Sequence, residues 1–314
     1  MMTGYLLDAR GERVDLPPFS EWKLKRTGTV PCDSFEGKCP WDGGMEPALE
    51  DACRLVVEEN GARRFTGVLD EYRLSWDDGG GVLTLSGRGL CALLLDNEAE
   101  GQDYQVATLA DILRDHVEPY GIPVGKVGSL PAVPGFSVAT GASEWQVLYS
   151  FARYHGGIQP RFDAWGSLIV DGVDGGRLMT IDDRTGVTAI AWRDKRYGVL
   201  SEILVRDRGT VAPLATQRVT NSRFLAQGGK CRRVITMPGK SAYQAMRYSG
   251  QFQLERSAEE RYRLELTVPG SYFCEPGDRV SVSLAKPALS GTWKVLETTA
   301  VLDSKGPRVT LTLG

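Results

Sequence analysis

The stretch Cys53–Gly89, which reads CRLVVEENGARRFTGVLDEYRLSWDDGGGVLTLSGRG, decides the fold class of this sequence. It contains two turn signals, Asn60-Gly61, which is typical of a β-hairpin, and the glycine-rich run from Asp77 to Gly81. After the second turn, Leu83 and Leu85 alternate with Thr84 and Ser86, which is the period of two of a β-strand. Turn signals about every ten residues predict a sandwich or barrel in the first third of the chain.

A helical segment follows this β region. Thr108 and Asp111 have the spacing of a helix N-cap, and apolar residues from Leu109 to Val117 then fall on one stripe before Pro119 and Gly121. A second cap-like pair, Ser143 and Gln146, predicts another helix that ends at Gly156-Gly157. Two short strands, 158–162 and 167–170, flank a tight turn. Residues 100–181 are therefore predicted to form a small α+β domain.

The remainder of the chain returns to β patterns. A strand is expected over 198–206, followed by a loop-rich polar region over 207–240 and a helix that begins near Ser241. Three alternating runs come last, and in two of them the polar partners are small hydroxyl residues, Ser281, Ser283, Thr310 and Thr312. A strand with one apolar and one hydroxyl face packs a core on one side and faces water or a lumen on the other. Both interpretations of the hydroxyl face, a channel lining or an ordinary solvated surface, remain open.

These patterns predict a β-dominated α+β protein in which two β domains bracket an α+β insertion. The expected division is 1–99 for the first β-barrel-like domain, 100–181 for the insertion, and 182–314 for the second β-barrel-like domain, with a polar and helical insertion around 207–258.

Composition and charge exclude some classes of protein. The chain has 314 residues, of which 42% are hydrophobic and 25% charged, and a formal net charge of −3. A duplex-DNA binder normally carries a basic footprint, and the net charge gives no sign of one. No run of about 18 apolar residues is present, and charged residues interrupt the first sixteen, so we expect neither a membrane span nor a signal peptide.

The sequence lacks the side-chain patterns of common catalytic sites. Its two histidines, His116 and His155, fall at predicted helix ends, where a basic residue is favourable. Four pairs of carboxylates are adjacent in sequence: Glu58/Glu59, Asp77/Asp78, Asp182/Asp183 and Glu259/Glu260. Because adjacent residues in a strand point to opposite faces, the two carboxylates of a pair are not expected to converge on one substrate atom. The six cysteines are scattered and are expected to be reduced, buried thiols. We therefore expect no enzyme activity, cofactor or metal.

Several motifs resemble the baseplate hub proteins of contractile phage tails, the Mu-type or late-control D family. The N-terminal motifs are Asp33-Ser-Phe35, Cys53-Arg-Leu-Val-Val57, Phe65-Thr-Gly-Val-Leu-Asp70, Leu83-Thr-Leu-Ser-Gly-Arg-Gly89 and Leu94-Leu-Asp-Asn97. The inserted-domain motifs are Thr108–Leu113, Tyr120-Gly-Ile122, the helix over 144–154 and Asp163–Leu168. Pro276–Val280 and Thr310–Leu313 resemble the second tube domain of the family.

The resemblance implies a homotrimer whose two similar β domains per chain form a pseudo-six-fold ring. Such a ring joins the tail tube to the central spike, contacts other baseplate subunits, and lets DNA pass without sequence-specific binding. The protein would be assembled in the host cytoplasm and would reside in the virion tail baseplate. Two alternatives are a spike or receptor-binding component of a related injection machine and a tail-associated peptidoglycan hydrolase.

Overall fold

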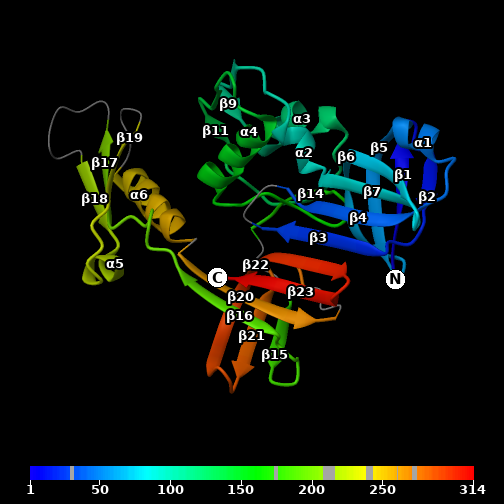
Figure 1. The fold of residues 1–314 in the computed structure, drawn as a ribbon. Helices are drawn as coiled ribbons and strands as arrows, with labels where there is room; N and C mark the ends of the chain where they lie inside the picture. Colours follow the sequence, from blue (N-terminus) through cyan, green and yellow to red (C-terminus); the bar gives the residue numbers. More distant parts are fainter. Residues whose placement is uncertain (29–31, 173–175, 208–215, 238–242, 260, 271–273) are drawn as a thin grey trace. The chain divides into compact units, whose positions relative to one another are not determined.

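The chain is divided into two compact units. The computed structural model describes residues 1–28, 32–172, 176–207, 216–237, 243–259, 261–270 and 274–314 (Figure 1). Unit 1 comprises Met1–Gly186 and Thr267–Leu311, and unit 2 comprises Val187–Leu266 and Thr312–Gly314. The two units are described separately below.

Unit 1 is built on a sheet that joins strands from both ends of the chain. Its strands and short helix are β1 (Met2–Asp8), β2 (Arg13–Leu16), β3 (Glu21–Thr27), β4 (Ser34–Trp41), α1 (Glu46–Asp51), β5 (Ala52–Glu59), β6 (Ala62–Asp77), β7 (Gly80–Gly89), β15 (Leu178–Asp182), β21 (Arg279–Leu284), β22 (Leu289–Asp303) and β23 (Gly306–Leu313). The strand order is β23-β22-β3-β4-β7-β6-β5-β1-β2, and β21 pairs with β22 on one side and β15 on the other. Because β22 lies antiparallel to β3, with Glu297 opposite Thr27, the C-terminal strands extend the N-terminal sheet.

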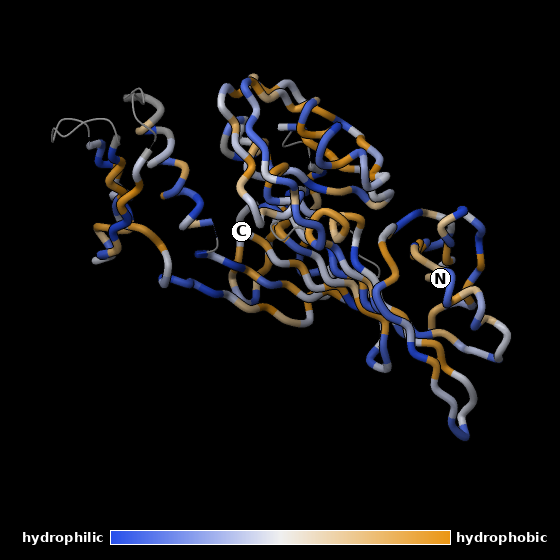
Figure 2. The backbone as a smooth tube through the Cα atoms, turned by 90° about the horizontal axis from the view of Figure 1, so that it is seen from above, coloured by the Kyte–Doolittle hydropathy of each residue, from blue (hydrophilic) through white to orange (hydrophobic). Residues whose placement is uncertain are grey.

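Strict alternation along these strands creates the core of the sheet. Leu24, Phe35, Leu83 and Leu85 all point to one face and are almost fully buried. The alternation of apolar and polar residues can be followed along the strands in Figure 2. The same core includes Met2, Leu6, Leu16, Phe19, Cys39, Leu49, Leu55, Val57 and Phe65. The segment between the two predicted turns forms one long strand, β6, with a bulge between Leu69 and Glu71.

The α+β insertion predicted for the middle of the chain is present within unit 1. Its elements are α2 (Cys91–Leu95), β8 (Gln102–Asp103), β9 (Val106–Ala107), α3 (Leu109–His116), η1 (Glu118–Tyr120), β10 (Val124–Val127), β11 (Val133–Pro134), β12 (Ser137–Val138), α4 (Glu144–Ser150), η2 (Phe151–His155), β13 (Arg161–Phe162) and β14 (Leu168–Val170). Both predicted N-caps are confirmed as reciprocal capping boxes, Thr108 with Asp111 and Ser143 with Gln146. Ile112, Leu148, Phe151 and Leu168 are fully buried in the core that these helices enclose.

Unit 2 is a small α+β structure. It contains β16 (Ala189–Asp194), β17 (Glu202–Asp207), β18 (Thr216–Thr220), α5 (Ser222–Ala226), β19 (Arg232–Met237), α6 (Tyr243–Ala258) and most of β20 (Tyr262–Pro269). β16 pairs with β20, and β18, β17 and β19 form a separate sheet in that order. α6 packs on β17 and β18, and the shared core consists of Leu200, Ile203, Val205, Val219, Met246 and Leu254.

One local prediction for this unit was wrong. The polar region over 207–240, expected to be loop-rich, contains two strands and a helix, β18, α5 and β19. Its strands are rich in charged and hydroxyl residues because only one of their faces is buried, and that composition resembles a loop. Residues 208–215 and 238–242 lie outside the described part of the chain, and with them the predicted helix start at Ser241.

The β-dominated α+β fold class, with an inserted α+β segment and a helix-containing C-terminal insertion, is confirmed. The division of the chain at residues 99 and 181 into matching β-barrel-like modules stays a prediction.

Candidate assembly surfaces

The N-terminal motif residues converge on one arginine. Arg88 of β7 donates to both carboxylate oxygens of Asp70 at 2.9 Å and to those of Asp96 at 3.1 and 2.7 Å. The bulge in β6 turns Asp70 toward Arg88, and Asp96 follows the last residue of α2. These hydrogen bonds raise the pKa of Arg88 and lower the pKa of Asp96. The cluster therefore ties the bulge of the sheet to the start of the insertion.

A second contact holds the insertion against β6. The hydroxyl of Thr66 donates to the carbonyl of Ala164 at 3.0 Å, in the tight turn before β14. A Cβ at the neighbouring Gly67 would lie 2.1 Å from the carbonyl oxygen of Arg88, so only glycine fits at this position. The guanidinium of Arg63 also lies over the Trp165 ring, 4.5 Å from its centroid. Close packing therefore explains the Thr66-Gly67 dipeptide, and no catalytic or ligand-binding role is needed.

The polar face of the unit 1 sheet forms a groove across five strands. The groove has a volume of about 530 Å³ and is lined by residues of β22, β3, β4, β7 and β6, among them Lys23, Glu36, Ser86, Glu71 and Val301. These five stand opposite one another in register, Val301 with Lys23, Lys23 with Glu36, Glu36 with Ser86, and Ser86 with Glu71. Because β22 supplies one wall, the groove exists only where the C-terminal and N-terminal strands meet.

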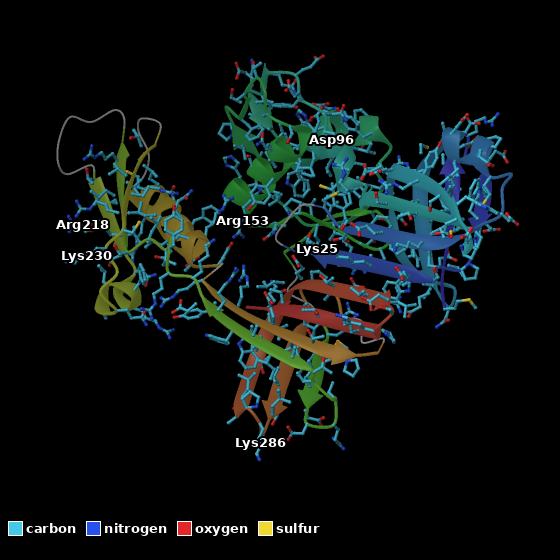
Figure 3. The ribbon with its side chains drawn as sticks, in the orientation of Figure 1. Lys25, Asp96, Arg153, Arg218, Lys230 and Lys286 are labelled. Atoms are coloured by element: carbon cyan, nitrogen blue, oxygen red, sulfur yellow. The ribbon has the colours of Figure 1, made fainter. Side chains whose placement is uncertain are left out.

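Charges of both signs alternate across this groove and its edge. Lys38 contacts Glu21 on the neighbouring strand at 2.8 Å, and Lys25 contacts Glu297 of β22 at 3.1 Å (Figure 3, where Lys25 is labelled). Such exposed pairs contribute little stability, on the order of 0–1 kcal/mol each. Their effect is a hydrated surface without the excess of positive charge that holds a nucleic-acid backbone.

The predicted hydroxyl residues lie on strand faces that are not fully buried. Ser281 is half-buried and stands in register between Thr180 and Thr292, so a hydroxyl row crosses β15, β21 and β22. Ser283 is exposed in the next row, beside Asp182 and Ser290. Thr310 and Thr312 of β23 are half-buried, and the Thr310 hydroxyl lies 3.0 Å from that of Thr267. The placement fits either a lumen or a solvated surface.

The histidine at the end of α3 belongs to a buried network. His116 Nδ1 lies 2.6 Å from Glu144, the first residue of α4, and Glu144 also accepts a hydrogen bond from the Tyr120 hydroxyl at 2.9 Å. On its other side, His116 Nε2 lies 3.1 Å from the hydroxyl of Tyr104, which donates to Asp115 at 2.9 Å. Burial raises the pKa of Tyr104, and it raises the pKa of Tyr120 to about 12. His116 and Glu144 are both almost fully buried, so the network joins two helices and does not present a base to solvent.

The other histidine and the carboxylate pairs are not brought together. His155 ends η2, its ring packs against Phe136 and Phe151, and the partial desolvation of the ring lowers its pKa. Glu58 and Glu59 are held by Arg63 and Arg64, and Asp182 by Arg184. Asp77 ends β6, Asp78 lies in the turn that leads to β7, and Glu260 lies outside the described residues.

The cysteines are free thiols. Burial raises the pKa of Cys39 to about 11 and the pKa values of Cys32 and Cys274 to about 12, which keeps them protonated. In the described ranges, no group of three or more His, Cys, Asp or Glu side chains could hold a metal ion. None of the described helices is both long and apolar enough to cross a bilayer.

Solved structures similar to this chain include tail proteins and a type VI secretion component. The chain aligns with a tail protein from Neisseria meningitidis at 20% identity and a TM-score of 0.80, over 99% of this chain and 96% of that one. The 43 kDa tail protein of prophage MuSo2 from Shewanella oneidensis aligns at 19% identity and a TM-score of 0.76, over 99% and 98%. A type VI secretion component of Escherichia coli, described as structurally similar to T4 phage tail proteins, aligns at 13% identity and a TM-score of 0.58, over 94% and 73%.

No family model and no curated protein sequence matches the chain. The similarity thus lies in the fold, which this chain shares with the two tail proteins.

The sequence-based candidates missed the charged groove. Its signal was nevertheless present, because in Glu21–Thr27 the residues Glu21, Lys23 and Lys25 alternate with Trp22 and Leu24. What the sequence did not contain was the identity of the strand that pairs with β3.

Proposed function

We propose that this chain is a structural, non-enzymatic baseplate hub of a contractile tail, in which three copies form a ring between the tail tube and the central spike. The observation that carries the proposal is the agreement of the fold with two tail proteins, one of them from a prophage, over nearly the whole length of each chain. A component that assembles by its surfaces needs a rigid sheet with broad polar faces, and unit 1 has this construction.

The pairing of β22 with β3 supports the ring. A three-fold object that meets a six-fold tube must present two similar β regions per chain at a fixed angle. Continuous main-chain pairing between the N-terminal and C-terminal strands is a rigid way to fix that angle. We further propose that Ser281, Ser283, Thr310 and Thr312 line the channel, where uncharged hydroxyls let DNA pass without binding.

Electron microscopy of the purified protein tests the proposal. We expect particles with three-fold symmetry, a central hole, and a mass of three chains by light scattering. A compact particle without a channel at every concentration would contradict the hub. A peptidoglycan zymogram tests the hydrolase alternative: clearing that is lost in a Glu58→Gln/Glu59→Gln variant would contradict a purely structural role.

The spike alternative also has structural support. A VgrG complex containing PdpA aligns with this chain at 7% identity and a TM-score of 0.56, over 99% of this chain and 64% of that one. The chain covers far more of the two tail proteins, and we therefore favour the hub.

A further inference from the structure

The formal charge is distributed very unevenly between the two units. Residues 187–266 contain fifteen Lys and Arg against seven Asp and Glu, a formal charge of +8. The whole chain has 37 and 40, so the remainder has twenty-two and thirty-three, a formal charge of −11. The small net charge of the whole chain, −3, conceals two units of opposite sign. Opposite charges of this size attract separate molecules over about a Debye length.

The open face of the unit 2 sheet concentrates this positive charge around an apolar centre. α6 covers the face that carries Ile203 and Val205, so Leu204 and its register partners Arg218 and Val234 lie on the opposite face. Val234, in the edge strand β19, is 46% exposed, so an apolar side chain on this face is open to solvent. We call Leu204, Arg206, Arg218, Arg232 and Val234 the basic face; Arg218 is labelled in Figure 3.

A single carboxylate lies within the basic face. Glu202 contacts Arg232 and lies 3.7 Å from Arg218. It lowers the local positive charge and orders two guanidinium groups around an apolar patch, a composition typical of protein interfaces. A nucleic-acid surface would instead leave the arginines available for phosphates. The face therefore fits a protein partner that offers an apolar anchor and carboxylates.

Unit 1 carries a surface with these properties at the end of its longest hairpin. β5 pairs with β6 only as far as Val68, and among the described strands the outer half of β6 pairs with β7 alone. At the end of this hairpin Trp76 is 69% exposed and packs edge-on against Trp41, with ring centroids 6.1 Å apart. A Cβ at Gly81, which lies between them, would be 2.1 Å from the Trp41 carbonyl oxygen and 2.8 Å from the Trp76 ring, so glycine is required for this arrangement.

Carboxylates surround the exposed tryptophan. Asp42 follows Trp41, Asp77 and Asp78 follow Trp76, and all three are exposed. We call Trp41, Asp42, Trp76, Asp77 and Asp78 the tryptophan tip. The indole nitrogen of Trp41 is buried and has no hydrogen-bond partner in the described structure.

We propose that the tryptophan tip of one copy docks on the basic face of a second copy. Trp76 would cover Leu204 and Val234 and stack against arginine, while Asp77 and Asp78 would pair with Arg218 and Arg232. Because the two surfaces differ, the contact is head-to-tail, and it closes into a ring when the rotation between copies allows. This inference rests on the proposed hub function and names the contact that would hold its ring together.

Charge-reversal variants in sedimentation velocity test the contact. The wild-type chain is expected to self-associate, more weakly at about 500 mM than at about 50 mM salt. The tip reversal Asp77→Lys/Asp78→Lys and the face reversal Arg218→Glu/Arg232→Glu should each weaken association about tenfold or more. Trp76→Ala should weaken it by a similar factor. The variant that combines both reversals in one chain should regain association to within about threefold of wild type.

The control variant is Arg223→Glu/Lys230→Glu, which changes the charge of unit 2 by the same amount at exposed positions outside the basic face. It should associate nearly as wild type does, and circular dichroism should show that every variant is folded. A wild-type chain that stays monomeric at all concentrations overturns the inference. The inference is also overturned if the variant with both reversals does not regain self-association. It is overturned as well if the face reversal weakens self-association no more than the control variant does.

Three further outcomes distinguish this contact from a nucleic-acid surface and from a ring held by different residues. Binding of a short DNA duplex that the face reversal abolishes, with self-association unchanged, would overturn the contact and show that the face binds nucleic acid. If rings form equally well in the reversal variants, the result would support the hub function and overturn this contact. If only dimers or open chains form, and the charge reversals weaken them as expected, the result would support the contact and contradict the ring.

Discussion

Unit 1 and unit 2 both bury apolar side chains against a sheet, but unit 1 buries them more completely. In unit 1 the sheet encloses large buried side chains, and the Phe35 ring packs at a tilt against Phe19 and Phe65 at centroid distances of 5.0 and 6.0 Å. In unit 2 one helix covers one face of a short sheet, and the opposite face leaves Val234 exposed. A two-layer unit with an uncovered apolar strand row is less stable alone and more available to a partner. The difference is that unit 1 has the larger and more fully enclosed core, whereas unit 2 leaves an apolar side chain exposed on its open face.

The largest effect is expected in the core of unit 1. Phe35→Ala removes a fully buried ring from the contact with Phe19 and Phe65 and should destabilise unit 1 by about 3–5 kcal/mol. Denaturant unfolding followed by tryptophan fluorescence measures the loss. A change under about 1 kcal/mol would show that the core around Phe35 repacks easily, and the contrast between the units would disappear.

The matched substitution in unit 2 should be milder and local. Leu254→Ala in α6 removes a buried side chain from the small core and should cost about 2–3 kcal/mol. Because the two units have separate cores, hydrogen exchange should accelerate in β17, β18 and α6 while amides of β4 and β7 keep their protection. Equal acceleration in both units would show that they unfold as one.

A smaller effect is expected at the arginine that links the β6 bulge to the insertion. Arg88→Met keeps the length of the side chain but removes its bonds to Asp70 and Asp96, which should cost about 1 kcal/mol because the cluster is partly exposed. Thermal unfolding measures the loss. Arg10→Met, which breaks a local pair with Asp8 on the surface, is the control and should change stability by less.

The smallest effect is a pH dependence at the β22–β23 hairpin. The hydrogen bond from Arg308 lowers the pKa of Asp303 to about 2, below its ordinary value of 3.8. A carboxyl group with a lowered folded-state pKa stabilises the protein above its unfolded pKa and loses that contribution as the pH falls toward 2. The stability difference between wild type and Asp303→Asn should therefore shrink between about pH 5 and pH 2.5. An NMR titration midpoint of Asp303 near 3.8 would contradict the expected pairing.

Local sequence signals located many elements of unit 1. The Asn60-Gly61 turn, the two capping boxes and the alternation in Val280–Leu284 all correspond to elements at the expected places. These signals work because a turn, a cap or a strand face depends on residues a few positions apart. The prediction for 207–240 was wrong because a half-exposed strand such as Thr216–Thr220 is as polar as a loop.

The charge asymmetry could have been found without a structure. Counting charges by segment rather than over the whole chain would have shown the basic excess of 187–266. The arrangement of those charges could not have been found in this way, because Arg218, Leu204 and Val234 come from three strands whose register the sequence does not specify.

By itself, the sequence determined the strand-rich composition, the alternation that assigns each side chain to a core or a polar face, the helix caps, and the total charge of each segment. Only the tertiary structure decided that β22 pairs with β3, that the groove from Lys23 to Glu71 crosses strands from both ends of the chain, and that Trp76 and Trp41 meet across Gly81. The physical reason is that alternation fixes the face on which a side chain lies, whereas the neighbour of a strand is chosen by main-chain hydrogen bonds that nearly every residue can make.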